Sequence, residues 1–142
     1  MIAFLALLAT AILFGGMVLY SFGVAPFVFR SFPAEEAGRV IRLAFPWYYL
    51  FVIVVAALAA ALLLAAGDAR SAVVMAVIAL IGVFARQALM PRIDAAREGR
   101  SAGDAAAARR FGRLHGVSVL LNLLQLASAA YVLHGFLQFM PA

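Results

Sequence analysis

Four polar side chains interrupt the apolar C-terminal part of the chain at steps of three and four residues, and they are His115, Ser118, Asn122 and Gln125. On an α-helix this spacing places all four on one face, within about 80° of His115. Lipid offers such side chains no hydrogen-bond partners, so we expect this face to turn towards other helices. Their chemistry then permits either hydrogen bonds between helices or a pocket for a ligand, metal or cofactor.

Arg86 and Gln87 are two further polar residues that we place with this candidate pocket. Both lie near the end of another apolar stretch, residues 72–90, at a depth similar to that of the polar face. Arg86 either extends its guanidinium to the lipid headgroups or pairs with a carboxylate on the same side of the membrane. The carboxylates expected on that side are those of Glu35, Glu36, Asp94, Glu98 and Asp104.

The ionisable residues restrict the chemistry further. All six acidic residues lie between the apolar stretches, whereas a proton-coupled cation exporter usually needs a carboxylate within a span. The chain has no Cys, which excludes thiolate metal sites and leaves His115 as the only candidate metal ligand of the polar face. No paired carboxylates in the spans, phosphate-binding loop or HExxH motif is present, so we expect no enzymatic activity and no catalytic residues.

The two histidines bear on cofactor binding. His115 and His134 are 19 residues apart, about 28 Å along one helix, so they cannot be the two axial ligands of one haem within a chain. A haem held by His115 alone, a haem shared by two chains, or a quinone inside the bundle stays open. The cofactor is therefore unknown at this stage.

Membrane-spanning helices are the elements that must hold these side chains. Of the 142 residues, 68% are hydrophobic and 12% are charged, whereas soluble domains are about 45–50% apolar and about 25% charged. Four apolar stretches without period-two alternation are long enough to cross a bilayer; they comprise about residues 2–25, 45–66, 72–90 and 114–139. We therefore predict an all-α integral membrane four-helix bundle that forms a single domain over residues 1–142.

The arginines predict the orientation of the spans. All eleven basic residues are Arg, and ten of them lie in the connections 26–44 and 86–113, whereas the 67–71 turn carries only Arg70. Because basic residues are enriched on the cytoplasmic side, we expect both termini on the non-cytoplasmic side of the cell inner membrane. Arginines placed between spans also argue against a nucleic-acid partner, which leaves the lipid bilayer as the expected partner.

The first connection is predicted to contain a helix of its own. Pro33 and the acidic pair that follows it favour a short interfacial helix over about residues 33–44, lying on the membrane surface. The second span then opens with aromatic residues, which we expect at the level of the lipid headgroups. These are Trp47, Tyr48 and Tyr49.

The second connection carries a helix-start signal. Ser101 and Asp104 are residue types that favour the first turn of a helix, and an alanine-rich stretch of high helix propensity follows them. We therefore expect the last span to extend into the cytoplasm over about residues 104–113.

The first apolar stretch, residues 2–25, is expected to be a retained span, because it lacks the basic start of a signal peptide and exceeds its usual apolar length. Small residues recur along it, and they are Ala11, Gly15, Gly16 and Gly23. Such residues let helix backbones approach closely. This helix-packing face then contacts either another helix of the bundle or a second copy of the chain in a homo-oligomer.

Four stretches of the chain resemble the signatures of a known family. They are FGGMVLYSFGVAPFVFRSFP, FPWYYLF, ARQALMPRIDAAREG and RRFGRLHGVSVLLNLL, in this order and over nearly the whole chain. In these stretches the chain resembles the transmembrane protein 205-like family, a four-pass membrane domain of unknown function. The resemblance implies a four-helix membrane bundle and supplies no catalytic residues. The chain is shorter than the eukaryotic members, mainly over residues 91–110.

Three functions fit these observations. The first is the handling or transport of a small solute or metal along the inward polar face. The second is a structural or accessory role in a membrane complex, which the small residues of the first span and the cytoplasmic arginines allow. The third is redox work with a haem or quinone held inside the bundle.

Overall fold

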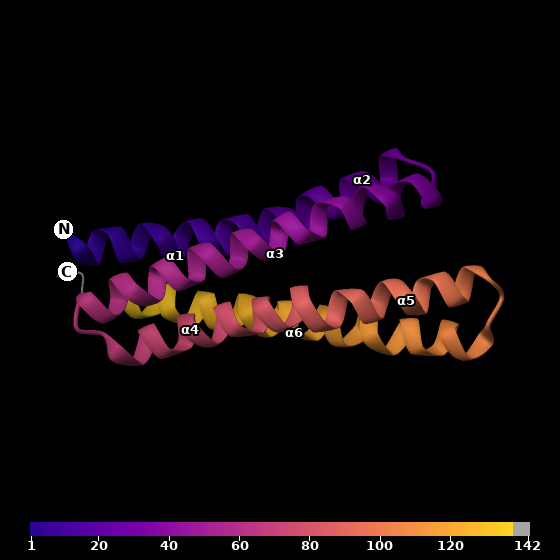
Figure 1. The fold of residues 1–142 in the computed structure, drawn as a ribbon. Coiled ribbons are helices and arrows are strands. Elements are labelled where there is room, and N and C mark those ends of the chain that lie inside the picture. Colours follow the sequence, from indigo (N-terminus) through magenta and orange to yellow (C-terminus); the bar gives the residue numbers. More distant parts are fainter. Residues whose placement is uncertain (138–142) are drawn as a thin grey trace.

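The computed structural model describes residues 1–137, and these residues are helical almost throughout (Figure 1). The elements, with η marking a π-helical segment, are α1 (Ile2–Val18), η1 (Leu19–Val24), α2 (Ala25–Ser31), α3 (Ala34–Ala65), α4 (Ala69–Phe84), η2 (Ala85–Leu89), α5 (Met90–Ser101) and α6 (Ala105–Leu137). No strand occurs in this part of the chain, so the all-α prediction is confirmed for it. The predicted end of the last span, residues 138–139, lies outside the described residues.

The eight elements join into four long helices of 30 to 33 residues, which are Ile2–Ser31, Ala34–Ala65, Ala69–Ser101 and Ala105–Leu137. Each is long and apolar enough to cross a membrane. At about 1.5 Å per residue, each also exceeds the roughly 30 Å of the hydrocarbon layer. The described chain is therefore a bundle of four membrane-spanning helices with length to spare.

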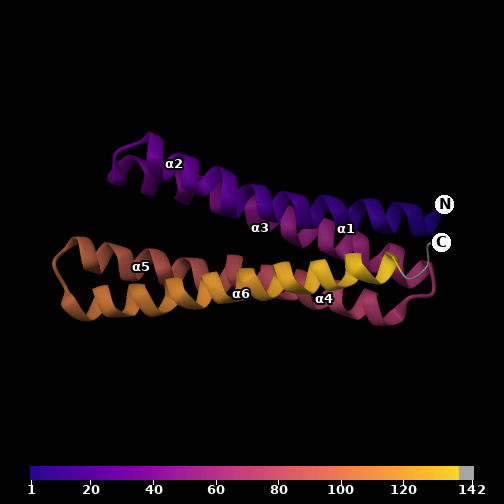
Figure 2. The same cartoon turned by 180° about the vertical axis from the view of Figure 1, so that it is seen from behind.

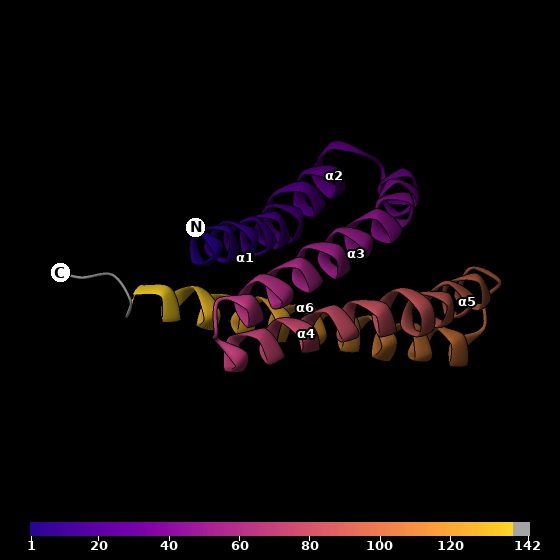
Figure 3. The same cartoon turned by 60° about the vertical axis from the view of Figure 1, so that its left-hand side comes forward.

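The long helices form two hairpins (Figures 1 and 3). Hairpin one pairs the first long helix with α3, and hairpin two pairs the α4–α5 helix with α6. The N-terminus and the turn at residues 66–68, which joins the two hairpins, lie at one end of the bundle, which we call the packed end. The turns within the hairpins, residues 32–33 and 102–104, lie at the other end, which we call the open end. The hairpins diverge towards the open end, also when seen from behind (Figure 2). Residues 25–44 are named arm one, and residues 90–113 are named arm two.

Capping and glycine geometry explain two of the three turns. Asp68 precedes α4, and its carboxylate accepts a hydrogen bond of 3.0 Å from the backbone N–H of Ser71. Asp104 accepts a similar bond of 2.7 Å in the first turn of α6. Gly67 and Gly103 adopt φ angles of 87° and 88°, a left-handed conformation that glycine alone reaches without steric cost.

Both hairpins carry a π-helical segment just before a proline. Pro26 follows η1 and Pro91 follows η2, each as the second residue of the next helix. Proline cannot donate a backbone hydrogen bond, and its ring clashes with the carbonyl four residues earlier, so a locally wider turn accommodates it. The two hairpins thus share one order of elements: helix, π-helical segment, proline-led helix, turn and long helix.

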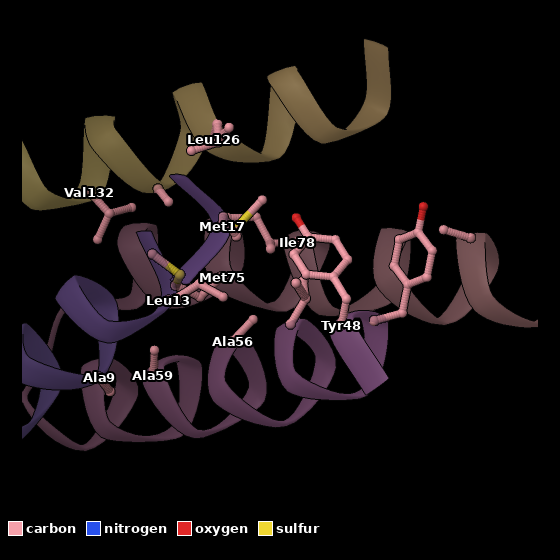
Figure 4. Close-up of a cluster of buried hydrophobic side chains, with 14 of the residues drawn as sticks. Ala9, Leu13, Met17, Tyr48, Ala56, Ala59, Met75, Ile78, Leu126 and Val132 are labelled. Carbon is pink, nitrogen blue, oxygen red and sulfur yellow. The ribbon is translucent and has the colours of Figure 1, made fainter. Parts of the chain in front are cut away.

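Small and apolar side chains fill the core between the hairpins (Figure 4). Those labelled in the figure come from all four long helices, and they are Ala9, Leu13, Met17, Tyr48, Ala56, Ala59, Met75, Ile78, Leu126 and Val132. Small residues let α3 and α4 approach closely. A Cβ added to the buried Gly82 of α4 would lie 2.9 Å from Ile53 Cγ1 of α3, so any larger residue there would force a shift.

The expected interfacial helix, residues 33–44, is not a separate element. Instead α3 runs from arm one into the span without a break, although Pro46 lies inside it. The buried residues of α3 keep helical spacing on both sides of the proline, and they begin with Ala37, Ile41, Tyr48, Tyr49 and Val52. One continuous inward face therefore holds the helix together across the proline.

Arm two contains a helix that the sequence analysis did not predict. Residues 90–101 form α5, which continues the third long helix and packs against α6. Met90, Ile93 and Ala96 are buried at spacings of three, so this mostly polar stretch still has an apolar stripe to cover. Ser101 ends α5 rather than starting α6, and Asp104 alone caps α6.

The small residues of the first span do not, apart from Gly16, pack within the bundle, whereas contact with a second copy of the chain stays a prediction. Ala11, Gly15 and Gly23 are exposed on the outer surface of the hairpin. Of the four residues only Gly16 allows a close approach, because an added Cβ would lie 2.5 Å from Phe51 Cζ. The inward side of α1 is formed instead by a mixed set at helical spacing, and these residues are Ala6, Ala9, Thr10, Leu13 and Met17.

Candidate functional site

A cluster of hydrogen-bonded polar side chains joins the two hairpins. Tyr48 of α3 donates its hydroxyl hydrogen to Asn122 Oδ1 of α6 at 2.5 Å. Asn122 Nδ2 in turn donates to Ser21 Oγ of η1 at 2.9 Å. The hydroxyls of Tyr49 and Ser118 share a further bond of 3.3 Å. Three of the four long helices therefore meet through polar groups at one level of the bundle.

A half-open cavity of about 220 Å³ lies beside this polar cluster. Residues of η1, the start of α2, α3 and α6 line this cavity. Its lining comprises Tyr20, Ser21, Phe22, Ala25, Phe45, Tyr48, Tyr49, His115, Ser118, Val119, Asn122 and Leu123. Its surface is mainly apolar with a few polar groups, and no Asp, Glu, Lys or Arg of the described residues lines it.

Aromatic rings form one wall of the cavity. Tyr20 stacks on Tyr48 with ring centroids 4.2 Å apart and an interplanar angle of 17°. Phe45 lies parallel to Tyr49 at 5.9 Å, with an angle of 16°. Tilted contacts connect these two pairs. The stacked pairs present a rigid wall against which a flat molecule can lie.

The Tyr20 hydroxyl is buried, and no described residue is its hydrogen-bond partner. A buried hydroxyl without a partner loses roughly 1–3 kcal/mol relative to one that is satisfied. The Ser21 hydroxyl, by contrast, is already engaged, because its oxygen accepts from Asn122 Nδ2 and the hydroxyl also hydrogen-bonds that of Tyr48. The site therefore contains one hydroxyl donor, that of Tyr20, whose hydrogen bond is not made within the described chain and which suits an acceptor oxygen.

The predicted polar face of α6 divides between two environments. Ser118 and Asn122 line the cavity, and His115 lies at its edge, where it is exposed and stacks on Phe111 at 5.8 Å. Gln125, one turn closer to the packed end, is 2% exposed and donates from Nε2 to the Ile78 carbonyl of α4 at 2.9 Å. The first three residues are available to a ligand, whereas Gln125 connects two helices.

Arg86 and Gln87 do not belong to this site. Both are exposed, and neither lines the cavity. Ala85 and Leu89 are the buried residues of η2, and residues one or two positions after Ala85 point about 100–200° away from it around the helix. The expectation that depth alone would bring Arg86 and Gln87 to the polar face is therefore wrong.

Sequence reasoning missed four of the seven polar side chains that line the cavity, those of Tyr20, Ser21, Tyr48 and Tyr49. Trp47, Tyr48 and Tyr49 were all expected at the lipid headgroups. Trp47 is 73% exposed, but Tyr48 and Tyr49 are only 8% and 3% exposed and lie inside the bundle. Tyr20 and Ser21 were not singled out at all. The signal for the tyrosines was present, because positions 41, 45, 48, 49 and 52 of α3 follow one helical face.

A metal site receives no support from this geometry. Among the described residues, no group of three or more His, Asp or Glu side chains is close enough together to hold a metal ion. His115 has only uncharged neighbours in the cavity lining. His134, the other histidine, is exposed on the far part of α6, which leaves it remote from His115.

The fold and the site define a class: an α-helical, multi-pass membrane protein with a mainly apolar cavity between two hairpins, lined by a few uncharged polar groups. Residues 8–102 match a family model described as a domain of unknown function, DUF4149, and the chain belongs to this family. The matched region contains Tyr20, Ser21, Tyr48 and Tyr49 but ends before α6. No curated protein and no solved structure matches the chain.

Proposed function

We propose that this protein handles a small, uncharged solute in the cavity between its hairpins, without catalysing a reaction. The observation that carries the proposal is the lining, in which hydroxyl and amide groups face a space walled by aromatic rings and free of fixed charge. Ligand sites combine apolar walls with a few placed polar groups in this way. A cavity of about 220 Å³ suits a molecule of about one ring with its substituents.

Binding tests the proposal directly. The protein in phosphatidylcholine nanodiscs is dialysed against neutral 4-hydroxybenzamide and against its charged counterpart 4-hydroxybenzoate, with empty nanodiscs as the reference. We expect saturable binding of the amide, at least tenfold tighter than that of the anion, because burial of an unpaired charge is costly. Absence of saturable amide binding to the wild-type protein would contradict the proposal.

Two variants of α6 place the binding in the cavity. Asn122→Ala removes a lining amide that bonds Tyr48 and Ser21, and we expect it to weaken binding about fivefold or more. Ser128→Ala is the matched control, because Ser128 is a half-buried polar residue of the same helix outside the cavity.

Transport is tested by solute uptake into liposomes that contain the protein. A His115→Ala, Asn122→Ala double variant should lose this flux.

A structural role is the second candidate, favoured by the bonds that link the hairpins. The Gln125 bond to Ile78 and the Asn122 bonds hold α6 to α4, α3 and η1. On this alternative, Asn122→Ala and Gln125→Ala both lower the thermal midpoint while no solute binds the wild-type protein. A haem or quinone role is checked by the absorption spectrum of the purified protein, oxidised and reduced.

We further propose that both arms face the cytoplasm, that the termini face the other side of the cell inner membrane, and that the family is the transmembrane protein 205-like one. Ten of the eleven arginines on the open-end side support the orientation. The chain has no Cys, so single cysteines report sidedness without background. In intact cells an impermeant maleimide should label Ala66→Cys at the packed end and spare Ser101→Cys in arm two; the reverse pattern would contradict the orientation.

A further inference from the structure

The mouth of the cavity is largely apolar, with exposed His115 as the polar residue at its edge. Phe22 of η1 is 64% exposed, and Val119 and Leu123 of α6 are 45% and 47% exposed. All three line the cavity at its outer side, and all three lie within membrane-spanning helices. Exposed apolar side chains of such helices contact acyl chains, so the cavity opens sideways into the bilayer.

The inner part of the same cavity is polar. Ser21, Tyr48 and Asn122 form a hydrogen-bonded line across it, and the Tyr20 hydroxyl is buried beside them without a partner. Polar groups therefore lie deep in the site and apolar groups lie at its entrance. This order is the reverse of a site that draws a soluble solute from water, where the entrance is the wetter part.

The position along the helices agrees with this arrangement. Ser21 lies about 19 residues from the packed-end start of the first long helix at Ile2, which is about 28 Å along it. The hydrocarbon layer is roughly 30 Å thick, so the polar line lies near the boundary of the bilayer on the open-end side. Molecules with a polar head and an apolar tail place their heads at this level.

From these observations we infer that the ligand is a membrane-dissolved amphiphile with a flat, uncharged head that bears acceptor oxygens, such as a ring carbonyl compound on an alkyl tail. The head lies against the Tyr20–Tyr48 stack and accepts a hydrogen bond from the Tyr20 hydroxyl, which a small side-chain shift exposes to the cavity. The tail leaves between Phe22 and Leu123 into the bilayer. This inference rests on the proposed solute-binding function and names the class of its ligand.

A pair of probes with one head separates entry from lipid and entry from water. The probes are 2,3-dimethoxy-5-methyl-1,4-benzoquinone without a tail and the same ring with a decyl tail at position 6. Binding to wild-type protein in phosphatidylcholine nanodiscs is measured by dialysis. The concentration of the decyl probe is given as its mole fraction in the lipid. Because the chain has no Cys, no thiol is present to add to the quinone ring.

Adjacent leucines supply the matched variants. Leu123 lines the mouth, whereas Leu124 is 51% exposed on the lipid-facing surface and does not line the cavity. Leu123→Trp should narrow the mouth and weaken decyl-probe binding at least tenfold, while Leu124→Trp should leave it within twofold. Both changes face lipid, where tryptophan is tolerated. Thermal midpoints of both variants equal to that of the wild-type protein would establish that neither is misfolded.

The outcomes distinguish the inference of an amphiphilic ligand from the proposed solute-binding function. Saturable decyl-probe binding that only Leu123→Trp weakens supports the inference. Tail-free binding that is unaffected by Leu123→Trp, together with no specific decyl-probe binding, overturns the inference but leaves the solute-binding function in place. Failure of both quinones and of 4-hydroxybenzamide overturns both. Tyr20→Phe provides an independent check, because it removes only the hydroxyl that has no partner in the described chain and should weaken decyl-probe binding about fivefold.

Discussion

The packed end and the open end are built from the same four helices, but different interactions hold them. At the packed end, apolar and small side chains from both hairpins are fully buried, among them Ala9, Leu13, Ala59 and Ala129. At the level of the cavity, hydrogen bonds between tyrosines, serine and asparagine connect the hairpins. Beyond it the arms diverge (Figure 3), and each packs chiefly against the other helix of its own hairpin. Packing fixes one end, which allows the other to separate around a site.

The two arms also differ from each other. Arm one carries exposed aromatic side chains, with Phe27 at 64%, Phe29 at 55% and Phe32 at 42%, beside its arginines and glutamates. Arm two has no exposed large apolar side chain among its described residues. Its surface is polar, and Phe111 is covered by the guanidiniums of Arg97 and Arg100 at 5.4 and 4.3 Å. Arm one suits the lipid interface, whereas arm two suits water.

The largest expected effect tests the packed end. Leu13→Ala removes a side chain that is 0% exposed, and we expect it to lower the free energy of unfolding by about 2 kcal/mol. This is the low end for core truncations, because in lipid the lost packing counts but transfer out of water does not. Unfolding in mixed detergent micelles measures it.

Leu8→Ala is the control for that change. Leu8 lies on the same helix but is 45% exposed to lipid, so its truncation should alter the free energy of unfolding by less than about 0.5 kcal/mol. Equal losses from the two variants would show that burial at the packed end is not what joins the hairpins.

A smaller effect concerns the turn at the packed end. Hydrogen bonds from the side chain and backbone of Ser71 lower the pKa of Asp68 below its ordinary value of 3.8. Since the folded pKa is the lower one, the stabilisation is fully present above that ordinary value and disappears as the pH falls through the folded pKa. Asp68→Ala should therefore cost about 1 kcal/mol at pH 7 and less at pH 3.

Asp68→Asn separates the cap from the charge. Asparagine keeps an acceptor for the Ser71 N–H but does not titrate. Thermal midpoints of this variant should stay near the wild-type value at pH 7, and the difference between pH 7 and pH 3 should shrink. An Asp68→Ala effect that grows as the pH falls would contradict the assignment.

The smallest expected effect is confined to arm two. Phe111→Ala removes the ring beneath Arg97 and Arg100, and cation–π contacts at exposed sites contribute about 0.5–1 kcal/mol. We expect faster amide hydrogen exchange over residues 90–113 and no change at the packed end, because the arm packs chiefly within its own hairpin and lies far from that end. Exchange that speeds up throughout the bundle would show that the arms and the core form one cooperative unit.

Much of the fold followed from the sequence, because apolar length and the absence of alternation are local properties. The inward turn of Ser118, Asn122 and Gln125 also followed, since helical spacing decides which residues share a face. The partners of these residues did not, because they depend on how far α3 and η1 slide along α6. The helical spacing of α3 indicates that Tyr48 and Tyr49 turn inward, but only this register places Tyr48 opposite Asn122.

The link between the hairpins bears on the order in which the chain is built into a membrane. Residues 66–68 form a turn of three residues with one carboxylate, so little polar chain has to be translocated after the first pair of helices. Synthesis completes hairpin one well before α6 emerges. Until then the hydroxyls of Tyr48 and Tyr49 lack the partners that α6 brings, Asn122 and Ser118. The cavity is therefore completed only when α6 has been synthesised and inserted. In a chain that ends before α6, the hydroxyls of Tyr48 and Tyr49 lack their hydrogen bonds to Asn122 and Ser118.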